Sequence, residues 1–242
     1  MRRLFLLLFL SAAAAAHGDW LSGNAGIASD YLFRGLDQTN GAAFQGGLDY
    51  ARDGGLYAGG WASNNRSAGG GELDLYGGYS RQTLAFGLLP ANLEAGAVGY
   101  LYSGERAHAL GGGSQDFAEL YAGIGAGPAS LKLYVAPDYA NRGGPGYTLR
   151  GSARFPLGAG FRLQLTVGYN AGRGVERQTA PLSADGAGHT YFNYALRLSR
   201  PLGNVATLWA EMAGTDLDLA QGAQGGSRQP RFLLGLRKDL DF

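Results

Sequence analysis

The chain lacks cysteine altogether and has two methionines among 242 residues. An exported protein without cysteine has no disulfide framework, which excludes most small secreted scaffolds. Long apolar runs are also scarce, because after the first ten residues no segment approaches the roughly 18 consecutive apolar residues that a transmembrane helix needs. If the mature chain enters a membrane, it must do so as a closed barrel, since only helices and closed barrels satisfy their backbone polar groups in lipid.

Neither sign of charge is in excess, with 20 basic and 19 acidic residues. Without Arg2 and Arg3, which lie in a segment that we expect to be removed, 18 basic residues remain against 19 acidic ones. A nucleic-acid-binding domain would show a basic excess. We therefore expect no nucleic-acid partner.

Histidine is rare, with His17, His108 and His189 as the three examples. None lies at metal-ligand spacing from another, so we predict no metal site and no cofactor and interpret all three as solvated loop residues. A lipid enzyme would need a serine near a histidine and a carboxylate or amide. Ser114 near His108 is the one local arrangement of that kind. We expect no enzyme, and an outer-membrane lipid-modifying enzyme is kept as an alternative.

The first 16 residues have the pattern of a secretory signal peptide. Arg2 and Arg3 precede the apolar run 4–10, and small residues follow up to an A-x-A site that ends at Ala16. The run is too short to span a bilayer as a helix. We expect cleavage near Ala16, which leaves residues 17–242 as a single domain.

Glycine, in contrast, is abundant, with 43 residues, about two and a half times the usual share of roughly 7%. Glycine at that density weakens helices and marks turns and close backbone approach in sheets.

Apolar and polar residues alternate with a period of two, as in strands between two unlike environments. The last segment, 231–242, alternates in this way and ends on Phe242. A terminal Phe after such a strand resembles the assembly signal of outer-membrane proteins, so we expect the barrel-assembly machinery as a partner.

The sequence predicts an all-β fold, a closed antiparallel transmembrane β-barrel of twelve strands. Short turns and longer polar loops alternate, which is typical of periplasmic turns and outer loops in barrels with an even strand number. The apolar phase shifts after Arg81, so we expect a bulge or an extra turn between Arg81 and Asn92, and ten or fourteen strands stay open. The predicted strands are 21–33, 43–51, 56–64, one that begins at 72, 93–103, 116–125, 129–139, 146–155, 161–170, 189–199, 204–215 and 231–242.

Aromatic residues near the predicted strand ends fit the interfacial girdles of such barrels. They are Tyr31, Phe33, Tyr57, Tyr79, Tyr102, Tyr139, Phe155, Phe161 and Tyr169.

One segment carries a family likeness. Residues 26–39, GIASDYLFRGLDQT, resemble the opening signature of the TorF family of porins. Residues 45–50, 55–59, 61–64, 72–76 and 78–80 are similar to that family's next three strands, in order. Most of the similar residues lie before about Tyr102, and fewer follow it. The segment between Arg81 and Asn92 differs from the family pattern. The likeness implies an outer-membrane barrel with a pore function, and it brings no substrate.

Alternation along the predicted strands places charges of opposite sign on opposite halves of the inner face. The predicted acidic wall consists of Asp30, Asp49, Glu72, Asp74 and Glu119. The predicted basic wall consists of Lys132, Arg150, Arg154, Arg162, Arg197 and Arg237, and Arg34 lies near the rim of the acidic half. Opposed walls would orient polar solutes and tune ion selectivity. The alternative is that these charges pair and plug the lumen, since buried ions require partners.

We therefore expect a porin-like channel of the bacterial outer membrane, surrounded by outer-membrane lipid, for passive diffusion of small polar solutes or ions. A plugged barrel with a structural or adhesive role stays open as an alternative. The sequence does not identify the solute or the oligomeric state.

Overall fold

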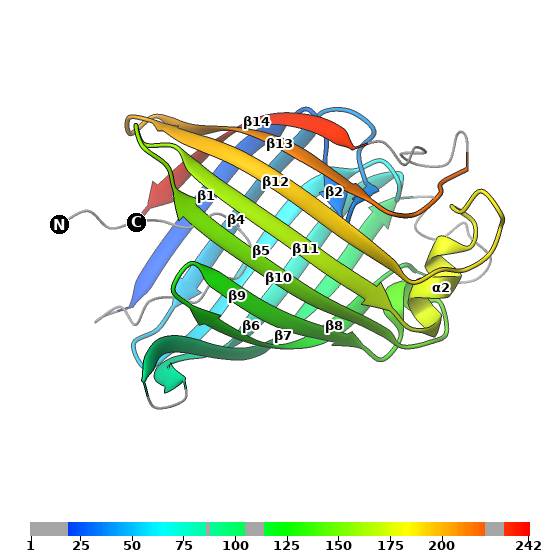
Figure 1. Ribbon diagram of the computed structural model, residues 1–242, viewed down its shortest axis with the longest axis horizontal. Coiled ribbons are helices and arrows are strands. Elements are labelled where there is room, and N and C mark those ends of the chain that lie inside the picture. The colour runs from blue at the N-terminus through cyan, green and yellow to red at the C-terminus, as the bar shows by residue number, and fades with distance from the viewer. Residues whose placement is uncertain (1–18, 86–87, 105–113, 221–229) are drawn as a thin grey trace.

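The computed structural model describes residues 19–85, 88–104, 114–220 and 230–242. The predicted signal peptide, His17 and His108 lie outside these residues. Within them, twelve antiparallel strands form one closed barrel (Figure 1). The barrel strands are β1 (Trp20–Ala28), β4 (Ala43–Ala51), β5 (Leu56–Asn65), β6 (Gly70–Ala85), β7 (Leu89–Gly104), β8 (Phe117–Ala126), β9 (Ala129–Ala136), β10 (Gly146–Pro156), β11 (Arg162–Ala171), β12 (Tyr191–Leu202), β13 (Ala206–Thr215) and β14 (Arg231–Asp241).

The two terminal strands close the sheet. β14 pairs with β1 in a register that runs from Ser22 opposite Asp241 to Ala28 opposite Gly235. Closure leaves no open strand edge, which is the condition that lipid imposes on a β-structure. The predicted closed antiparallel barrel of twelve strands is confirmed, and the alternatives of ten and fourteen strands are wrong.

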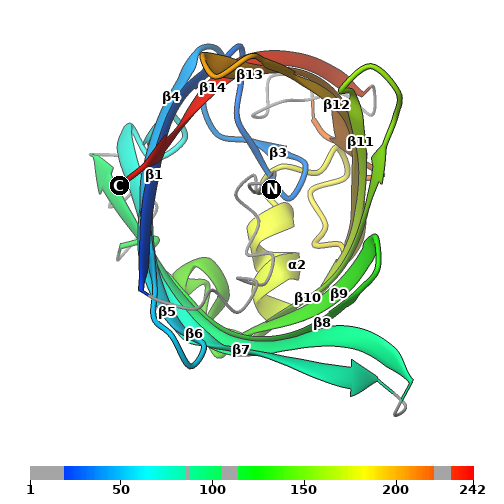
Figure 2. The same ribbon diagram turned by 90° about the vertical axis from the view of Figure 1, so that its left-hand side faces the viewer.

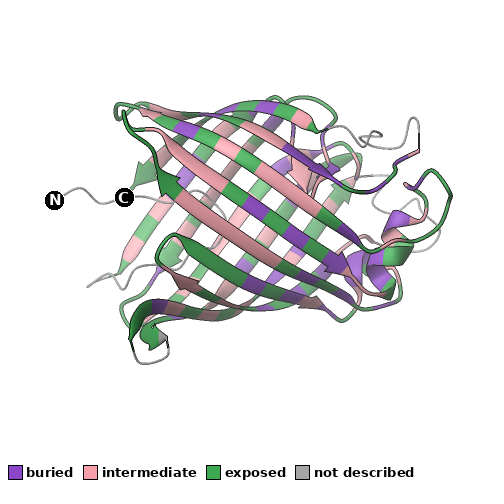
Figure 3. Ribbon diagram, in the orientation of Figure 1, coloured by how far each residue is buried: buried purple, intermediate pink, exposed green. Residues whose placement is uncertain are grey.

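The outer surface of the barrel is apolar because alternate side chains along each strand point outward. On β12, Leu196 and Leu198 are exposed, whereas Ser199 is buried on the inner face. On β11, Leu165 and Val167 are exposed in the same way. Exposed positions recur along the outer wall (Figure 3). Such a continuous apolar surface would be a liability in water, and it is what an outward-facing lipid band requires.

Inward glycines make room for large rings inside the barrel. A Cβ atom added at Gly59 would come within 2.5 Å of Tyr76 Cε2, on the residue directly opposite in β6. An aromatic ring laid over a cross-strand glycine also covers its exposed backbone. The same arrangement recurs in the pairs Gly78–Tyr57, Gly96–Tyr121 and Gly235–Trp209. The high glycine content therefore helps to hold aromatic side chains in the lumen.

β6 and β7 pair without interruption from Gly70 opposite Gly104 to Ala85 opposite Leu89. The bulge predicted between Arg81 and Asn92 is therefore wrong. The apolar phase shifts there because the strands leave the barrel wall: β5 pairs with β6 only as far as Tyr79. β7 stays paired with β8 as far as Ala91, and the ends of β6 and β7 beyond this point project as a two-stranded ribbon, visible at the lower left of Figure 1.

The connections differ between the two ends of the barrel. Short turns lie at the end where β1 begins and β14 ends, and the other end carries longer loops with a 3-10 helix, η1 (Tyr139–Asn141), and α2 (Arg173–Thr179) (Figure 1). Neither described helix is long and apolar enough to cross a membrane.

The predicted first strand, 21–33, is too long, because β1 ends at Ala28. The chain then forms a small hairpin, β2 (Leu32–Phe33) and β3 (Leu36–Asp37).

The predicted aromatic girdles are partly wrong. Tyr79, Phe155 and Tyr169 are exposed on the outside, as expected. The rings that instead lie inside are those of Tyr31, Phe33, Tyr57, Tyr102 and Tyr139. Four of these pack with Tyr100, Phe117, Tyr121 and Tyr134 in one internal aromatic cluster. Aromatic residues near strand ends therefore lie on both the outer and the inner face of the barrel wall.

Substitution of Phe242 tests the predicted assembly signal. Its N–H donates to the Leu21 carbonyl at 3.3 Å, next to the β1–β14 seam. We predict that Phe242→Ala lowers the amount of barrel in the outer-membrane fraction severalfold. Phe232→Ala is the matched control, because Phe232 lies near the start of β14, the strand that ends just before Phe242, and is 78% exposed against 72% for Phe242. Equal losses in the two variants, measured by quantitative blotting, would contradict a special role for the terminal residue.

Candidate functional site

The loop between β1 and β4 folds into the barrel. Its β2–β3 hairpin lies within the ring of strands when the barrel is viewed along its axis (Figure 2). Gly35 at the tip approaches β13, since an added Cβ atom would lie 2.7 Å from the Gly214 carbonyl oxygen. Tyr31 at the base packs edge-on against Trp61 of β5, with ring centroids 5.2 Å apart. The hairpin thus crosses the lumen and narrows it.

Arg34 at the hairpin tip is held by an ion pair and by aromatic rings. Its Nη2 lies 2.6 Å from Glu119 Oε2 on β8, and the Tyr100 hydroxyl donates to the same oxygen at 3.0 Å. The guanidinium carbon lies 5.4 Å and 5.5 Å from the ring centroids of Tyr134 and Tyr139. The Glu119 side chain is 0% exposed. Because loss of one partner from a buried pair costs roughly 3–5 kcal/mol, this contact is a strong anchor for the tip.

The backbone at the tip is one that arginine does not favour. Arg34 has φ +52° and Gly35 has φ +81°, the geometry of a two-residue turn whose first position is usually Asn, Asp or Gly. A left-handed conformation at a non-glycine residue costs roughly 1–2 kcal/mol. The ion pair with Glu119 offsets that cost, so Arg34 is explained by its side-chain contacts and not by turn preference.

Charged groups also fix the base of the hairpin. The Thr39 hydroxyl donates to Asp30 Oδ1 at 2.8 Å. Arg231 of β14 reaches both flanks of the hairpin, because its Nη1 lies 2.9 Å from Asp30 Oδ2 and also pairs with Asp37. Base and tip are therefore tied to opposite parts of the wall.

The predicted acidic residues reach the lumen by two routes. Asp49 on β4, Glu72 and Asp74 on β6, and Glu119 on β8 lie on the inner face, whereas Asp30 comes from the loop. The Tyr76 hydroxyl donates to Asp49. Glu72 accepts from the Tyr31 hydroxyl at 3.2 Å and from Asn65 Nδ2 at 2.8 Å. Asp74 keeps one buried oxygen, Oδ1, with no hydrogen-bond partner among the described residues.

The predicted basic residues alternate with outward-facing side chains along their strands. They are Lys132 on β9, Arg150 and Arg154 on β10, Arg162 on β11, Arg197 on β12 and Arg237 on β14, while Arg34 belongs to the hairpin. Besides Arg34–Glu119, the ion pairs of this set include Lys132–Glu94 at 2.6 Å, Arg197–Glu211 at 2.7 Å and Arg237–Asp239 at 2.6 Å. Glu211 and Asp239 thus place carboxylates among the predicted basic strands. The opposed walls and the pore-lining role of these residues stay predictions.

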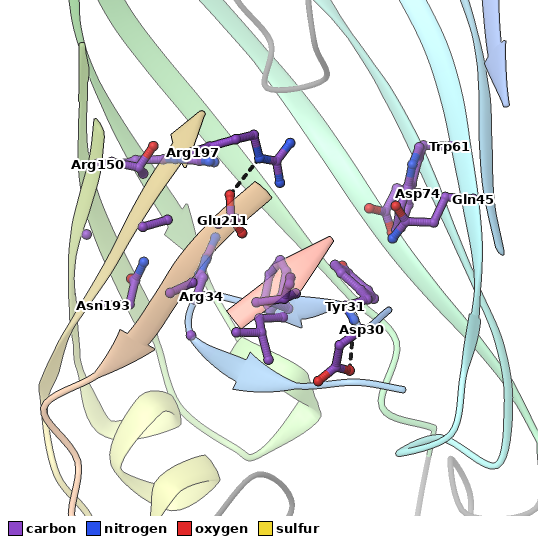
Figure 4. A pocket seen from close by; sticks show the side chains of 18 of the residues that line it. Asp30, Tyr31, Arg34, Gln45, Trp61, Asp74, Arg150, Asn193, Arg197 and Glu211 are labelled. Atoms are coloured by element: carbon purple, nitrogen blue, oxygen red, sulfur yellow. Dashed lines mark hydrogen bonds and ion pairs between the residues drawn. The ribbon is translucent and has the colours of Figure 1, made fainter. Parts of the chain in front are cut away.

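A cavity of about 250 Å³ lies in the lumen beside the hairpin. Arg150 and Arg197 border it on one side, and Trp61, Gln45 and Asp74 border it on the other (Figure 4). The lining also includes backbone and side chains of the hairpin. The site is therefore a small polar and aromatic chamber with basic groups facing an acidic and aromatic side.

The strands also carry ionic residues of the site that were not predicted from the sequence, among them Glu94, Glu211 and Arg231. Each lies in a predicted strand, with exposed apolar neighbours such as Leu93 or Phe232. The alternation of apolar and polar residues along these strands is the sequence signal that could have assigned the three side chains to the inner face. Glu211 lies directly opposite Arg197 on the adjacent strand, so its ion pair follows from strand register. The pairs of Arg231 with Asp30 and Asp37 depend on the inserted hairpin, which the sequence did not predict.

Of the residues considered for chemistry, the described ones, His189 and Ser114, lie outside the strands. His189 Nε2 lies 3.0 Å from both carboxylate oxygens of Asp185, and both side chains are exposed. The Ala187 backbone N–H, followed by the His189 ring, holds the pKa of Asp185 below its usual range. The Ser114 hydroxyl accepts from the Asp116 N–H at 3.0 Å. Among the described residues no group of three or more His, Cys, Asp or Glu side chains could hold a metal ion.

A comparison with protein families gives one match. A family model described as "Bacterial protein of unknown function (Gcw_chp)" matches residues 12–232. Its name differs from that of the TorF family, so the TorF likeness stays a resemblance. No curated protein matches the sequence.

Solved outer-membrane structures share the fold at low identity. The KdgM porin has 12% identity and a TM-score of 0.53, with 90% of this chain and 98% of that chain covered. The COG4313 outer membrane channel from Pseudomonas putida F1 has 13% identity and a TM-score of 0.51, with 94% and 97% covered. The NanC porin has 12% identity and a TM-score of 0.50, with 92% and 98% covered. At these identities the likeness establishes the fold.

The Arg34–Glu119 pair predicts how the hairpin can be released. Glu119→Gln removes the buried carboxylate, and the uncompensated charge on Arg34 then favours solvent over the lumen. We expect trypsin to cleave after Arg34 in the folded variant and to leave the native barrel intact at that bond, as read by mass spectrometry. Glu211→Gln is the control, because it breaks the Arg197 ion pair instead. Equal protection of Arg34 in the native chain and Glu119→Gln would contradict the anchoring role.

Proposed function

We propose that this chain, which belongs to the Gcw_chp family of bacterial proteins of unknown function, is a narrow passive channel of the outer membrane for small polar solutes or ions. The observation that carries the proposal is the charged chamber of about 250 Å³ inside a closed, outwardly apolar barrel. Pockets for drug-sized ligands begin at roughly 300 Å³. A chamber slightly below that size suits small solutes.

The hairpin would set the width of the channel. It crosses the lumen near the end that carries the long loops, and ion pairs at its tip and base fix its position. A solute would pass between this hairpin and the charged wall. In a low-dielectric lumen, acidic and basic groups on opposite sides would produce a transverse field that orients dipolar solutes.

The names of the structural neighbours support this proposal. Two are porins and a third is an outer membrane channel. The KdgM porin is also known in complex with disordered oligogalacturonate, and by analogy a polar or charged solute is the class that we propose for this chain. The resemblance of residues 26–39 to the TorF porins supports the same function.

The proposal includes a location and partners. The apolar outer surface fits outer-membrane lipid, and the predicted signal peptide would direct export. We propose that the barrel-assembly machinery inserts the chain and recognises its terminal strand with Phe242. A nucleic acid is not among the proposed partners.

A plugged barrel with a structural or adhesive role is the second candidate. It is favoured by the internal aromatic cluster, in which Tyr100 stacks on Phe117 with ring centroids 4.5 Å apart and Phe117 lies 5.0 Å from Tyr139. These rings and the hairpin occupy much of the lumen on the loop side. Conductance separates the two candidates.

We predict that the refolded chain gives discrete, small single-channel currents in a planar lipid bilayer. Replacing residues 32–37 with a short Gly-Ser turn should raise the conductance severalfold, because the hairpin no longer crosses the lumen. Replacing the exposed turn 157–160 by Gly and Ser is the control and should leave the conductance unchanged. If the native chain is silent and the hairpin variant conducts, the plugged barrel is the correct reading.

The charge of the basic wall predicts the ion selectivity. Replacing Arg150, Arg154 and Arg162 together by Gln should shift the reversal potential in a salt gradient towards cations, since three positive charges leave the lumen. The matched control replaces the outward-facing Arg200, which stacks on Phe161 at 5.0 Å. An unchanged reversal potential in the triple variant would rule out the model of opposed walls.

A further inference from the structure

The Arg197 side chain is fixed in place while its terminal nitrogens remain available. Its Nε donates to Glu211 Oε2 at 2.7 Å, and its guanidinium carbon lies 4.1 Å from the Trp209 ring centroid. Neither Nη atom has a protein partner among the described residues, and neither is buried from solvent. Arg197 lines the cavity and points into it (Figure 4). A guanidinium held in this way presents two parallel N–H groups, the geometry that binds a carboxylate bidentately.

Arg154 repeats this arrangement two strands away. Its Nε donates to Gln164 Oε1 at 3.0 Å, so the plane of its guanidinium is also set. Gln164 lies directly opposite Arg154 on one side and opposite Arg197 on the other. Arg154, Gln164, Arg197 and Glu211 therefore form one row across the inner face of β10 to β13. Arg150 lies close enough to Arg154 to interact with it electrostatically.

The acidic groups across the lumen do not balance this row. Glu72 and Glu119 are buried and engaged with the hairpin residues Tyr31 and Arg34. Glu94 is occupied by Lys132. Asp49 accepts a hydrogen bond from Tyr76, and Asp74 borders the cavity on the side opposite the arginines. Glu211 is the carboxylate in contact with the arginine row, so Arg150, Arg154 and Arg197 outnumber the two nearby carboxylates, Glu211 and Asp74. The open face of the chamber therefore favours a solute with negative charge.

Aromatic surfaces distinguish an organic anion from an inorganic one. Trp61 and Tyr100 line the same cavity as Arg197, and Ala195 and the buried Leu233 add apolar contact. Inorganic phosphate needs donors on all sides, whereas a small organic acid offers a carboxylate to the guanidinium and carbon atoms to the rings.

We propose that the row formed by Arg154, Gln164 and Arg197, together with Arg150, is a binding site for small organic carboxylates that carry at least two negative charges. Arg197 would hold one carboxylate through both Nη atoms, and Arg154 would attract the second. This inference rests on the proposed channel function and names the class of solute for it.

The test is isothermal titration of the refolded full-length chain in detergent micelles with sodium succinate at constant ionic strength. We expect saturable binding that weakens about tenfold in Arg197→Gln, since a hydrogen-bonded contact to a charged group is lost. Arg197→Lys should also weaken binding, because an ammonium keeps the charge but not the two parallel N–H groups. Arg200→Gln on the outer face of the same strand is the matched control and should bind succinate as the native chain does.

Three outcomes would overturn the site: no succinate binding by the native chain, equal weakening in Arg197→Gln and Arg200→Gln, or tighter binding of phosphate than of succinate. Retained affinity in Arg197→Lys with a loss in Arg197→Gln would also overturn the bidentate contact. Titration in micelles does not depend on ion flow. Binding without any conductance would therefore contradict the channel alone, and conductance without binding would contradict the carboxylate site alone.

Discussion

The closure of β14 onto β1 is the constraint on which the rest of this structure depends. In lipid, every backbone N–H and C=O of a strand needs a partner within the protein, and the seam from Ser22 to Ala28 supplies it for both end strands. Closure also separates two faces that follow different rules. The outer face must be apolar, so polar and charged side chains and many large rings are confined to the lumen.

Charged side chains that are confined to the lumen need partners of opposite charge within it. The β2–β3 hairpin brings Arg34 to the buried Glu119 and places Asp30 and Asp37 against Arg231. These pairs engage Glu119 of β8 and the two carboxylates of the hairpin loop. The terminal nitrogens of Arg154 and Arg197 have no protein partner among the described residues. The β2–β3 hairpin thus narrows the lumen and influences which sign of charge a solute would meet there.

The sequence predicted the wall of the barrel far better than its interior. Alternation and turn residues located twelve strands, and the second matched Ala43–Ala51 at both ends, because a period of two reflects a local environment. Asp30 was assigned to the first strand and Arg34 to the rim just beyond it, since nothing local marks the end of β1 at Ala28. Contacts across the lumen, such as Arg34–Glu119, join residues 85 positions apart, and such contacts depend on closure. The rings of Tyr31 and Tyr57 were misplaced for the same reason.

The central claim is that the Arg34–Glu119 ion pair holds the hairpin across the lumen and thereby limits the channel. A charge exchange tests it most directly, with single-channel conductance compared among Arg34→Glu, Glu119→Arg and the double variant. The account predicts that each single variant conducts more than the native chain, because two like charges repel at the tip, and that the double variant returns towards native conductance. Native conductance in both single variants would contradict the claim.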